Sequence, residues 1–239
     1  MTGLSVRNLS YAYGAKRALN DISFNVEQGA FCALIGPNGA GKSTLFALLT
    51  RLITSRTGTI EIAGHDLGSH PEKALGKIGI VFQQPSLDLD LTVWRNLSYF
   101  AGLHGLSGQA AEASIRSALD RLDMAERTHE RVRNLNGGHR RRLEIARALV
   151  HSPTVLLLDE PSVGLDAAAR RAITEHAHDL CKTHGMTVLW ATHLTDEISA
   201  DDQVVILHKG QVLRNCPCHE LTRDKPLQEA FLDLTEHGT

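Results

Sequence analysis

The sequence predicts an α/β fold with a three-layer core, an N-terminal antiparallel β subdomain and an inserted α-helical subdomain. Two observations support this class. Five mostly continuous apolar runs are typical of parallel strands that are covered on both faces. Several of these runs are separated by segments with helical spacing, which is the alternation of a three-layer core. The chain has 239 residues, so one large core with attached subdomains is the economical interpretation.

The N-terminal part is predicted to form the β subdomain. Residues 4–9 and 22–26 alternate apolar and polar side chains, and "GTIEIAG" repeats this pattern between two glycines. Such alternation is typical of half-buried antiparallel strands. We therefore expect these segments to pair with one another.

The core strands and helices follow one another along the chain. The continuous apolar runs lie at residues 31–36, 78–83, 154–159, 186–192 and 202–208. The main segments with helical spacing are residues 42–53, 139–150 and 167–183. The order is that of β-strands alternating with helices in a parallel sheet.

The chain between Gln83 and Leu135 differs from the core, because it has helical spacing and few β-branched residues. We interpret it as the inserted helical subdomain. The whole chain, residues 1–239, is then a single domain: a core with its β subdomain at about 1–83 and 151–215, a helical subdomain at about 84–150, and a C-terminal tail at 216–239. Leu227, Phe231 and Leu234 recur at helical spacing, so we expect the tail to dock as a short final helix.

Composition limits the location and partners. Lys and Arg number 25 against 27 Asp and Glu, whereas nucleic-acid-binding domains usually carry a strong positive surplus. No apolar run approaches the length of a membrane span, and the first ten residues are not a signal peptide. Four scattered cysteines suit a reducing compartment. We expect a cytoplasmic chain without a nucleic-acid partner.

The stretch "CPCH" at residues 216–219 contains two of these cysteines and a histidine. It could be half of a metal site, but a stable zinc site normally takes four ligands. We therefore predict an exposed turn here.

A glycine-rich loop predicts a phosphate site. "GPNGAGKST" follows a predicted strand and opens a predicted helix, which is the context of a P-loop. Its residues are Gly36, Pro37, Asn38, Gly39, Ala40, Gly41, Lys42, Ser43 and Thr44. The glycines let backbone N–H groups converge on phosphate oxygens, the lysine would neutralise the β and γ phosphates, and the serine would ligate Mg²⁺. The fold class is therefore a P-loop NTPase with a RecA-like core.

Polar residues end three of the apolar runs, where open α/β sheets bind their ligands. Asp159 would hold Mg²⁺, and Glu160, ionised near neutral pH unless buried, could orient or deprotonate the attacking water. His193 could contact the γ-phosphate, although a lone histidine at a strand end is more often structural. Gln83 is the matching candidate for a contact with Mg²⁺ and water.

The stretch "RNLNGGHRRRLEIARAL" raises a question about charge. Two glycines open a predicted helix, and a histidine and three arginines occupy its first turn. A helix N-terminus already carries partial positive charge, so an anion is expected there. The basic residues would add to its field. A solvent-facing role is also open for one or two of the arginines.

The motifs GPNGAGKST, Gln83, LNGGH, VLLLDEP, Asp166 and His193, in this order and spacing, resemble those of an ATP-binding cassette (ABC) ATPase over nearly the whole chain. The resemblance implies a head-to-tail homodimer that encloses two MgATP. Asn136, Gly137, Gly138 and His139 would form the signature motif, whose helix N-terminus faces the γ-phosphate held by the other copy. The usual motif is LSGGQ, so Asn136 and His139 depart from it.

The resemblance also implies two further roles. Tyr13 matches the aromatic residue that stacks on adenine, with Tyr11 as the alternative. Asp166 matches the loop that crosses the dimer interface.

The expected function is that of the nucleotide-binding subunit of an ABC transporter, acting with separate membrane-spanning subunits at the cytoplasmic face of the inner membrane. A soluble ABC ATPase of translation or DNA maintenance is the alternative, but the second cassette or long coiled coil of those types does not occur here. A non-ABC NTPase would not need the signature.

Two stretches, "FQQPSLDLDLTV" and "LQEAFLDLT", resemble exporter ATPases of the drug and cytochrome-assembly type. The signature stretch more narrowly resembles cassettes of pyrroloquinoline quinone-dependent alcohol oxidation systems. Residues 83–100 are expected to form the groove for a membrane subunit's helix.

Overall fold

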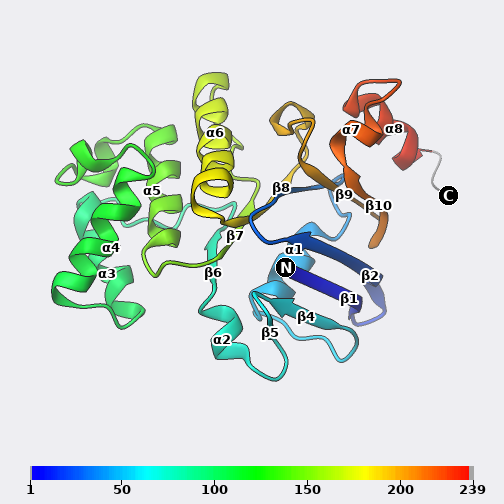
Figure 1. The fold of residues 1–239 in the computed structure, drawn as a ribbon, viewed down its shortest axis with the longest axis horizontal. Coiled ribbons are helices and arrows are strands. Elements are labelled where there is room, and N and C mark those ends of the chain that lie inside the picture. The colour runs from blue at the N-terminus through cyan, green and yellow to red at the C-terminus, as the bar shows by residue number, and fades with distance from the viewer. Residues whose placement is uncertain (1, 237–239) are drawn as a thin grey trace.

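A six-stranded sheet forms the centre of the computed structural model, which describes residues 2–236 (Figure 1). Its strand order is β10-β9-β3-β8-β7-β6. The strands are β3 (Phe31–Ile35), β6 (Ile78–Val81), β7 (Val155–Asp159), β8 (Thr187–Thr192), β9 (Gln203–His208) and β10 (Gln211–Pro217). Strands β3, β6, β7, β8 and β9 run parallel to one another, and β10 pairs antiparallel with β9. All five predicted parallel strands are therefore confirmed.

A second, antiparallel sheet has the order β2-β1-β4-β5. It is built from β1 (Thr2–Tyr13), β2 (Lys16–Glu27), β4 (Thr59–Ile62) and β5 (His65–Asp66). β1 is central: Val6 pairs with Phe24 on one side and with Ile60 on the other. The predicted β subdomain is confirmed, and β1 and β2 are longer than the alternating pattern indicated.

The side chains of the parallel strands divide into two cores by strict alternation. Phe31, Ala33 and Ile35 pack on the face that carries α5 (Gly137–Leu149) and α6 (Ala167–His184). Cys32 and Leu34 point to the other face, toward α1 (Lys42–Leu49) and the antiparallel sheet. The three layers are thus helices, the parallel sheet, and the antiparallel sheet with α1. The predicted fold class is confirmed.

The chain between β6 and β7 is helical. α3 (Val93–Leu103), α4 (Gly108–Asp120) and α5 gather at one end of the molecule, drawn in green in Figure 1. Thr92 caps α3 by accepting a hydrogen bond from the Arg95 N–H at 3.2 Å. α2 (Pro71–Leu75) is a short helix before β6.

The C-terminal segment contains α7 (Cys218–Leu221) and α8 (Leu227–Glu236). Leu227 is buried, and Phe231 and Leu234 pack against the core, as the helical spacing predicted. The predicted exposed turn at residues 216–219 is wrong: Cys216 continues β10 and Cys218 begins α7 with its side chain buried. The pattern Cys-Pro-Cys gave no sign that a strand ends here and that Cys218 is buried. Within residues 2–236, no helix is long and apolar enough to cross a membrane.

A histidine fixes α6 to the segment that precedes β9. His178 Nε2 lies 2.9 Å from both carboxylate oxygens of Asp202, and its Nδ1 lies 2.9 Å from the Thr174 carbonyl oxygen. The ring stacks on Phe31 at 4.1 Å. Burial alone would lower the pKa of His178, but the hydrogen bond and charge of Asp202 outweigh it, so the pKa is raised.

We expect this contact to make stability depend on pH. Because the folded-state pKa of His178 lies above the unfolded one, the stabilisation is complete below the unfolded value and is lost as pH rises through the folded value. The measurement is the urea midpoint of the wild type and of His178→Gln between pH 6 and 9. The wild type should lose stability as pH rises from the unfolded to the raised folded pKa of His178, and the variant should lack this decline. An exposed control, His129→Gln, should keep it; equal slopes in all three would contradict the prediction.

Candidate functional site

A cleft of about 500 Å³ opens at the carboxyl ends of the parallel strands. It is lined by Tyr13, Lys16, Arg17, Ala18, the loop residues 37–44, Gln83, Glu160 and Lys209. Three segments far apart in sequence therefore meet here: the end of β1, the glycine-rich loop and the ends of the strands. Most of the residues predicted for one nucleotide site lie together.

The loop between β3 and α1 needs its glycines for two different reasons. A Cβ on Gly36 would lie 2.3 Å from the backbone oxygen of Leu207, so β9 leaves no room for a side chain. Gly41 has φ 115°, in the left-handed region, and a Cβ there would lie 2.7 Å from Leu19 Cδ2. The loop is thus pressed against its neighbours, and its residues 37–44 line the cleft.

Gly36→Ala should destabilise the fold by about 1–3 kcal/mol, because backbone atoms of β9 must move to admit the methyl group. Gly102→Ala is the matched control, since nothing lies within 4 Å of the place that its methyl group would take in α3. That control should be neutral or stabilise by up to about 1 kcal/mol. Urea unfolding measures both. Equal urea midpoints for the two variants would show that the close approach of Gly36 to Leu207 does not affect the stability of the fold.

A lysine and two carboxylates form a charged cluster at the cleft, which Lys42 and Glu160 line. Lys42 is buried; its Nζ donates to the Gly36 carbonyl oxygen at 2.5 Å and lies 3.7 Å from Glu160 Oε1. Burial lowers the pKa of Lys42, and the charges of Glu160 and Asp159 oppose that shift. Burial, followed by the charge of Glu160, raises the pKa of Asp159. A buried cation beside two acids matches a site that handles phosphate and a divalent metal.

The backbone holds Glu160 in an unusual conformation. Its φ of 47° is rare for a residue other than glycine, and its N–H donates to the Ala191 carbonyl oxygen at 2.9 Å. The side chain reaches both ways: Oε1 faces Lys42, and Oε2 lies 3.3 Å from His193 Nδ1. The sequence predicted a phosphate contact for His193, and the structure pairs it with Glu160.

Tyr13 and Gln83, which were predicted to contact the adenine and Mg²⁺ respectively, are both exposed. The Tyr13 side chain is 53% exposed and lines the cleft, whereas Tyr11 packs edge-on against it with ring centroids 4.9 Å apart. The geometry therefore favours Tyr13 over Tyr11 as a base-stacking residue. Gln83 lies two residues after the end of β6, and it too lines the cleft.

The segment Asn136–His139 lies elsewhere. Asn136 Oδ1 accepts the His139 N–H at 2.8 Å and so caps α5, as Asp166 caps α6 by accepting the Ala169 N–H at 2.8 Å. A Cβ on Gly138 would lie 3.0 Å from the Ala169 Cβ, so the two helix starts pack closely. None of residues 136–139, nor Asp166, is among the described residues that line the cleft.

Two of the three arginines that follow this segment make contacts within the chain. Arg141 is buried and pairs with Glu144 at 2.7 Å, and Arg140 donates to the backbone oxygens of Val132 and Arg133. These two cations therefore have partners within the chain, which the sequence did not predict. The sequence missed this because helical spacing does not say which residue of a basic run faces a neighbouring segment. Burial, followed by the charges of Arg127 and Arg142, lowers the pKa of His139 and favours its neutral form.

Several lining residues were missed by the sequence reasoning. Lys16, Arg17 and Lys209 add positive charge around the cleft, yet nothing in their sequence context separates them from ordinary surface cations. Glu197 is buried behind the site, where it accepts hydrogen bonds from Trp190 Nε1 at 2.9 Å, from Thr192 Oγ1 at 2.6 Å and from the Ser162 hydroxyl. Nothing in its sequence context distinguished this acid from the neighbouring Asp196.

Comparison with known proteins decides between the classes of nucleotide-binding protein. The family model described as "ABC transporter" matches residues 19–163. The chain belongs to the ABC transporter family. A Nod factor export ATP-binding protein I from Burkholderia orbicola is 37% identical to this ABC cassette over 91% of the chain and 72% of that protein.

Solved ABC structures agree with the fold. CbiO1 from Clostridium perfringens, part of an ABC transporter complex, superposes with a TM-score of 0.85 at 29% identity, over 98% of this chain and 95% of that chain. The bacterial ABC transporter cassette MJ0796, solved as a dimer, gives a TM-score of 0.77 at 25% identity, over 90% and 98% of the two chains. This ABC cassette is an ATP-binding ATPase subunit of a transporter.

Proposed function

We propose that this ATPase subunit drives export through ATP-dependent closure of a head-to-tail homodimer beneath membrane-spanning subunits. The observation that carries the proposal is the separation of the predicted site into two surfaces: Lys42 and Glu160 line the cleft, whereas Gly137 and Gly138 do not. A second copy, facing the opposite way, would bring its α5 N-terminus to the triphosphate. The likeness to an export ATP-binding protein and to a dimeric cassette supports this arrangement.

Within one chain, the proposed roles follow from position. Tyr13 stacks on the adenine, and the backbone N–H groups of residues 37–44 bind the phosphates together with Lys42. Glu160, held by the Ala191 carbonyl and by His193, accepts a proton from the attacking water. His193 keeps that carboxylate oriented and would also contact the γ-phosphate.

The residues beside Lys42 fit Mg²⁺. Ser43 and Gln83 line the cleft, and Asp159 lies at the end of β7 beside Glu160, which together offer the oxygen donors that this ion prefers. Bound there, Mg²⁺ would neutralise charge on the β and γ phosphates. The raised pKa of Asp159 describes the protein without the ion; a cation would restore its ionised form.

In the proposed dimer, the signature segment binds the partner's γ-phosphate. Asn136 Oδ1 is engaged in capping α5, which leaves its amide N–H groups as donors where the usual serine offers a hydroxyl. The backbone N–H groups of the two glycines and the helix dipole complete the anion site. Asp166, at the start of α6, would face the partner across the interface, and His139 would approach in its neutral form.

The test is to isolate the chain from its native membranes in mild detergent and identify what co-purifies. A stoichiometric integral membrane protein supports the proposal, and so does crosslinking of that protein to a cysteine placed at Leu89, which is 45% exposed in the loop before α3. Recovery with ribosomes or DNA would instead support a soluble ABC ATPase of translation or DNA maintenance. Co-purification with a membrane protein would also support association with a membrane, whereas the cytoplasmic face of the inner membrane and the narrower link to alcohol oxidation systems stay predictions.

A further inference from the structure

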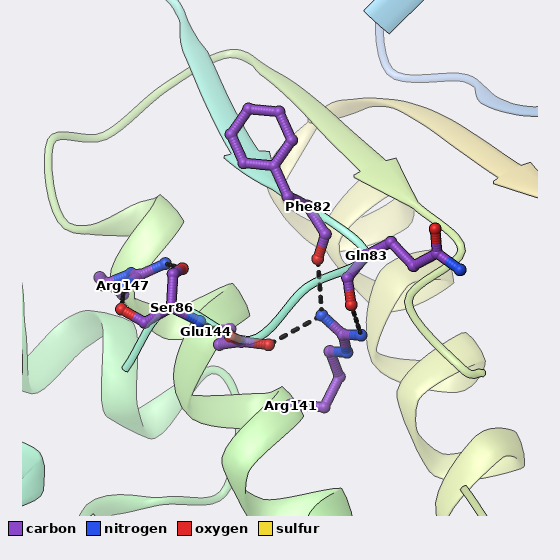
Figure 2. Close-up of polar contacts among 6 residues, drawn as sticks. All are labelled: Phe82, Gln83, Ser86, Arg141, Glu144 and Arg147. Carbon is purple, nitrogen blue, oxygen red and sulfur yellow. Dashed lines mark hydrogen bonds and ion pairs between the residues drawn. The ribbon is translucent and has the colours of Figure 1, made fainter. Parts of the chain in front are cut away.

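Three charged side chains on one face of α5 hold the segment that follows β6 (Figure 2). Arg141, Glu144 and Arg147 are 6%, 3% and 6% exposed, respectively. Their spacing of three residues places them on the same side of the helix. The segment they hold, residues 82–86, has no helix or strand of its own in the structure. Its position therefore depends on these contacts.

Arg141 binds the start of this segment. Its Nη1 donates to the Phe82 carbonyl oxygen at 3.0 Å, and its Nη2 lies 3.3 Å from the Gln83 carbonyl oxygen. Nη1 also donates to Glu144 Oε2 at 2.7 Å, so the guanidinium is held from the helix side as well. Figure 2 shows the planar group lying between the helix and the two consecutive carbonyls. A lysine ammonium could keep the charge but not this forked geometry.

The other end of the segment is held by the two remaining side chains. Glu144 Oε1 accepts the Ser86 N–H at 2.9 Å. Arg147 donates to the Ser86 carbonyl oxygen at 2.8 Å and to its hydroxyl at 2.5 Å. Both ends of the segment therefore follow α5 if this helix moves.

These contacts connect two surfaces that the fold keeps apart. α5 is continuous from Gly137 to Leu149, and its first turn carries the segment capped by Asn136. Gln83 lines the cleft together with Lys42 and Glu160. Arg141 therefore joins the helix whose first turn carries the signature segment to the backbone of the residue whose side chain lies in the cleft.

We propose that Arg141, held by Glu144, is a positioning residue that sets the place of Gln83 in the nucleotide cleft and makes it depend on α5. The inference rests on the proposed function, because it takes Gln83 to act on the bound magnesium nucleotide and α5 to meet the partner's phosphate. Arg141 itself does not line the cleft, and its effect on hydrolysis passes through Gln83.

The test is a double-variant cycle with Arg141→Lys and Gln83→Ala. Arg141→Lys should lower the rate of ATP hydrolysis about tenfold, because charge-assisted hydrogen bonds to the segment are lost. It should also raise the Mg²⁺ concentration needed for half-maximal rate, while affinity for ATP without Mg²⁺ stays unchanged. In a Gln83→Ala background, Arg141→Lys should change the rate by less than about twofold.

Arg116→Lys is the matched control, because Arg116 makes a two-nitrogen contact with Glu112 on the exposed surface of α4, at 3.2 and 2.6 Å. It loses a forked contact of the same kind and should hydrolyse ATP like the wild type. If the effects of Arg141→Lys and Gln83→Ala multiply, the arginine acts through general stability or another route, and the proposal fails. Wild-type rate and Mg²⁺ dependence in Arg141→Lys would also overturn it.

Failure of the proposed function looks different. A wild-type chain that never forms a dimer with ATP, or a Gln83→Ala variant with unchanged hydrolysis, removes the premise that α5 meets a phosphate or that Gln83 acts on the nucleotide. If the wild type hydrolyses ATP and dimerises normally, but the rate effects of Arg141→Lys and Gln83→Ala multiply, only the proposed role of Arg141 is refuted.

Discussion

Glu160→Gln is expected to lower the rate of ATP hydrolysis by about 10² to 10⁴-fold, the range that a positioned general base supplies. The amide keeps the shape of the side chain, and the backbone contact with Ala191 does not depend on it. What disappears is the ability to accept a proton from water, together with the charge that faces Lys42 and His193. Steady-state release of phosphate measures the rate.

The same substitution should trap the dimer. Because Glu160→Gln leaves the glycine-rich loop and Lys42 in place, ATP still binds and the closed assembly is not emptied by hydrolysis. Light scattering with MgATP should give twice the mass of one chain, and without nucleotide the mass of one chain. Glu72→Gln, an exposed change at the start of α2, is the control and should hydrolyse normally. Hydrolysis at wild-type speed in Glu160→Gln would assign the base to another residue.

The sequence predicted the parts of the site that depend on local order. Residues 36–41 lie between β3 and α1, and Lys42 to Thr44 form the first turn of that helix, so the order of strand, loop and helix along the chain places all of them. Asp159 and Glu160 follow a run of buried residues, and a strand end in a parallel sheet places them at one edge. These inferences require only the hydrophobic pattern of the sequence and the shared direction of the parallel strands.

The remaining features depend on which distant segments meet. Arg141 and Arg140 occupy adjacent places in one basic run, yet one binds the segment after β6 and the other binds the turn before α5. Lys209 lines the cleft only because β9 lies beside β3, a neighbour relation that follows from the crossover connections rather than from local spacing. The strained backbone of Glu160 is set by its contact with β8. Tertiary pairing decides each of these cases.

Lys42→Ala should produce the opposite pattern to Glu160→Gln: nucleotide binding itself weakens, by about 10- to 100-fold, because the charge-assisted hydrogen bonds to phosphate are lost. The lysine is buried and its pKa is lowered by that burial, so holding this ammonium in the cleft costs the fold some stability. Removing it should leave the urea midpoint little changed. Titration with a fluorescent ATP analogue measures the affinity.

Lys209→Ala provides the matched control, since Lys209 also lines the cleft but is exposed. An exposed cation interacts through water and contributes only about 0–1 kcal/mol, so affinity should fall by no more than about fivefold. Comparing the two variants distinguishes a specific contact between Lys42 and phosphate from a general attraction of the anionic nucleotide to a positively charged cleft. If both lysine variants lose affinity equally and both recover it at low salt, the cleft binds anions through its overall field, and the buried Lys42 has no specific phosphate to neutralise.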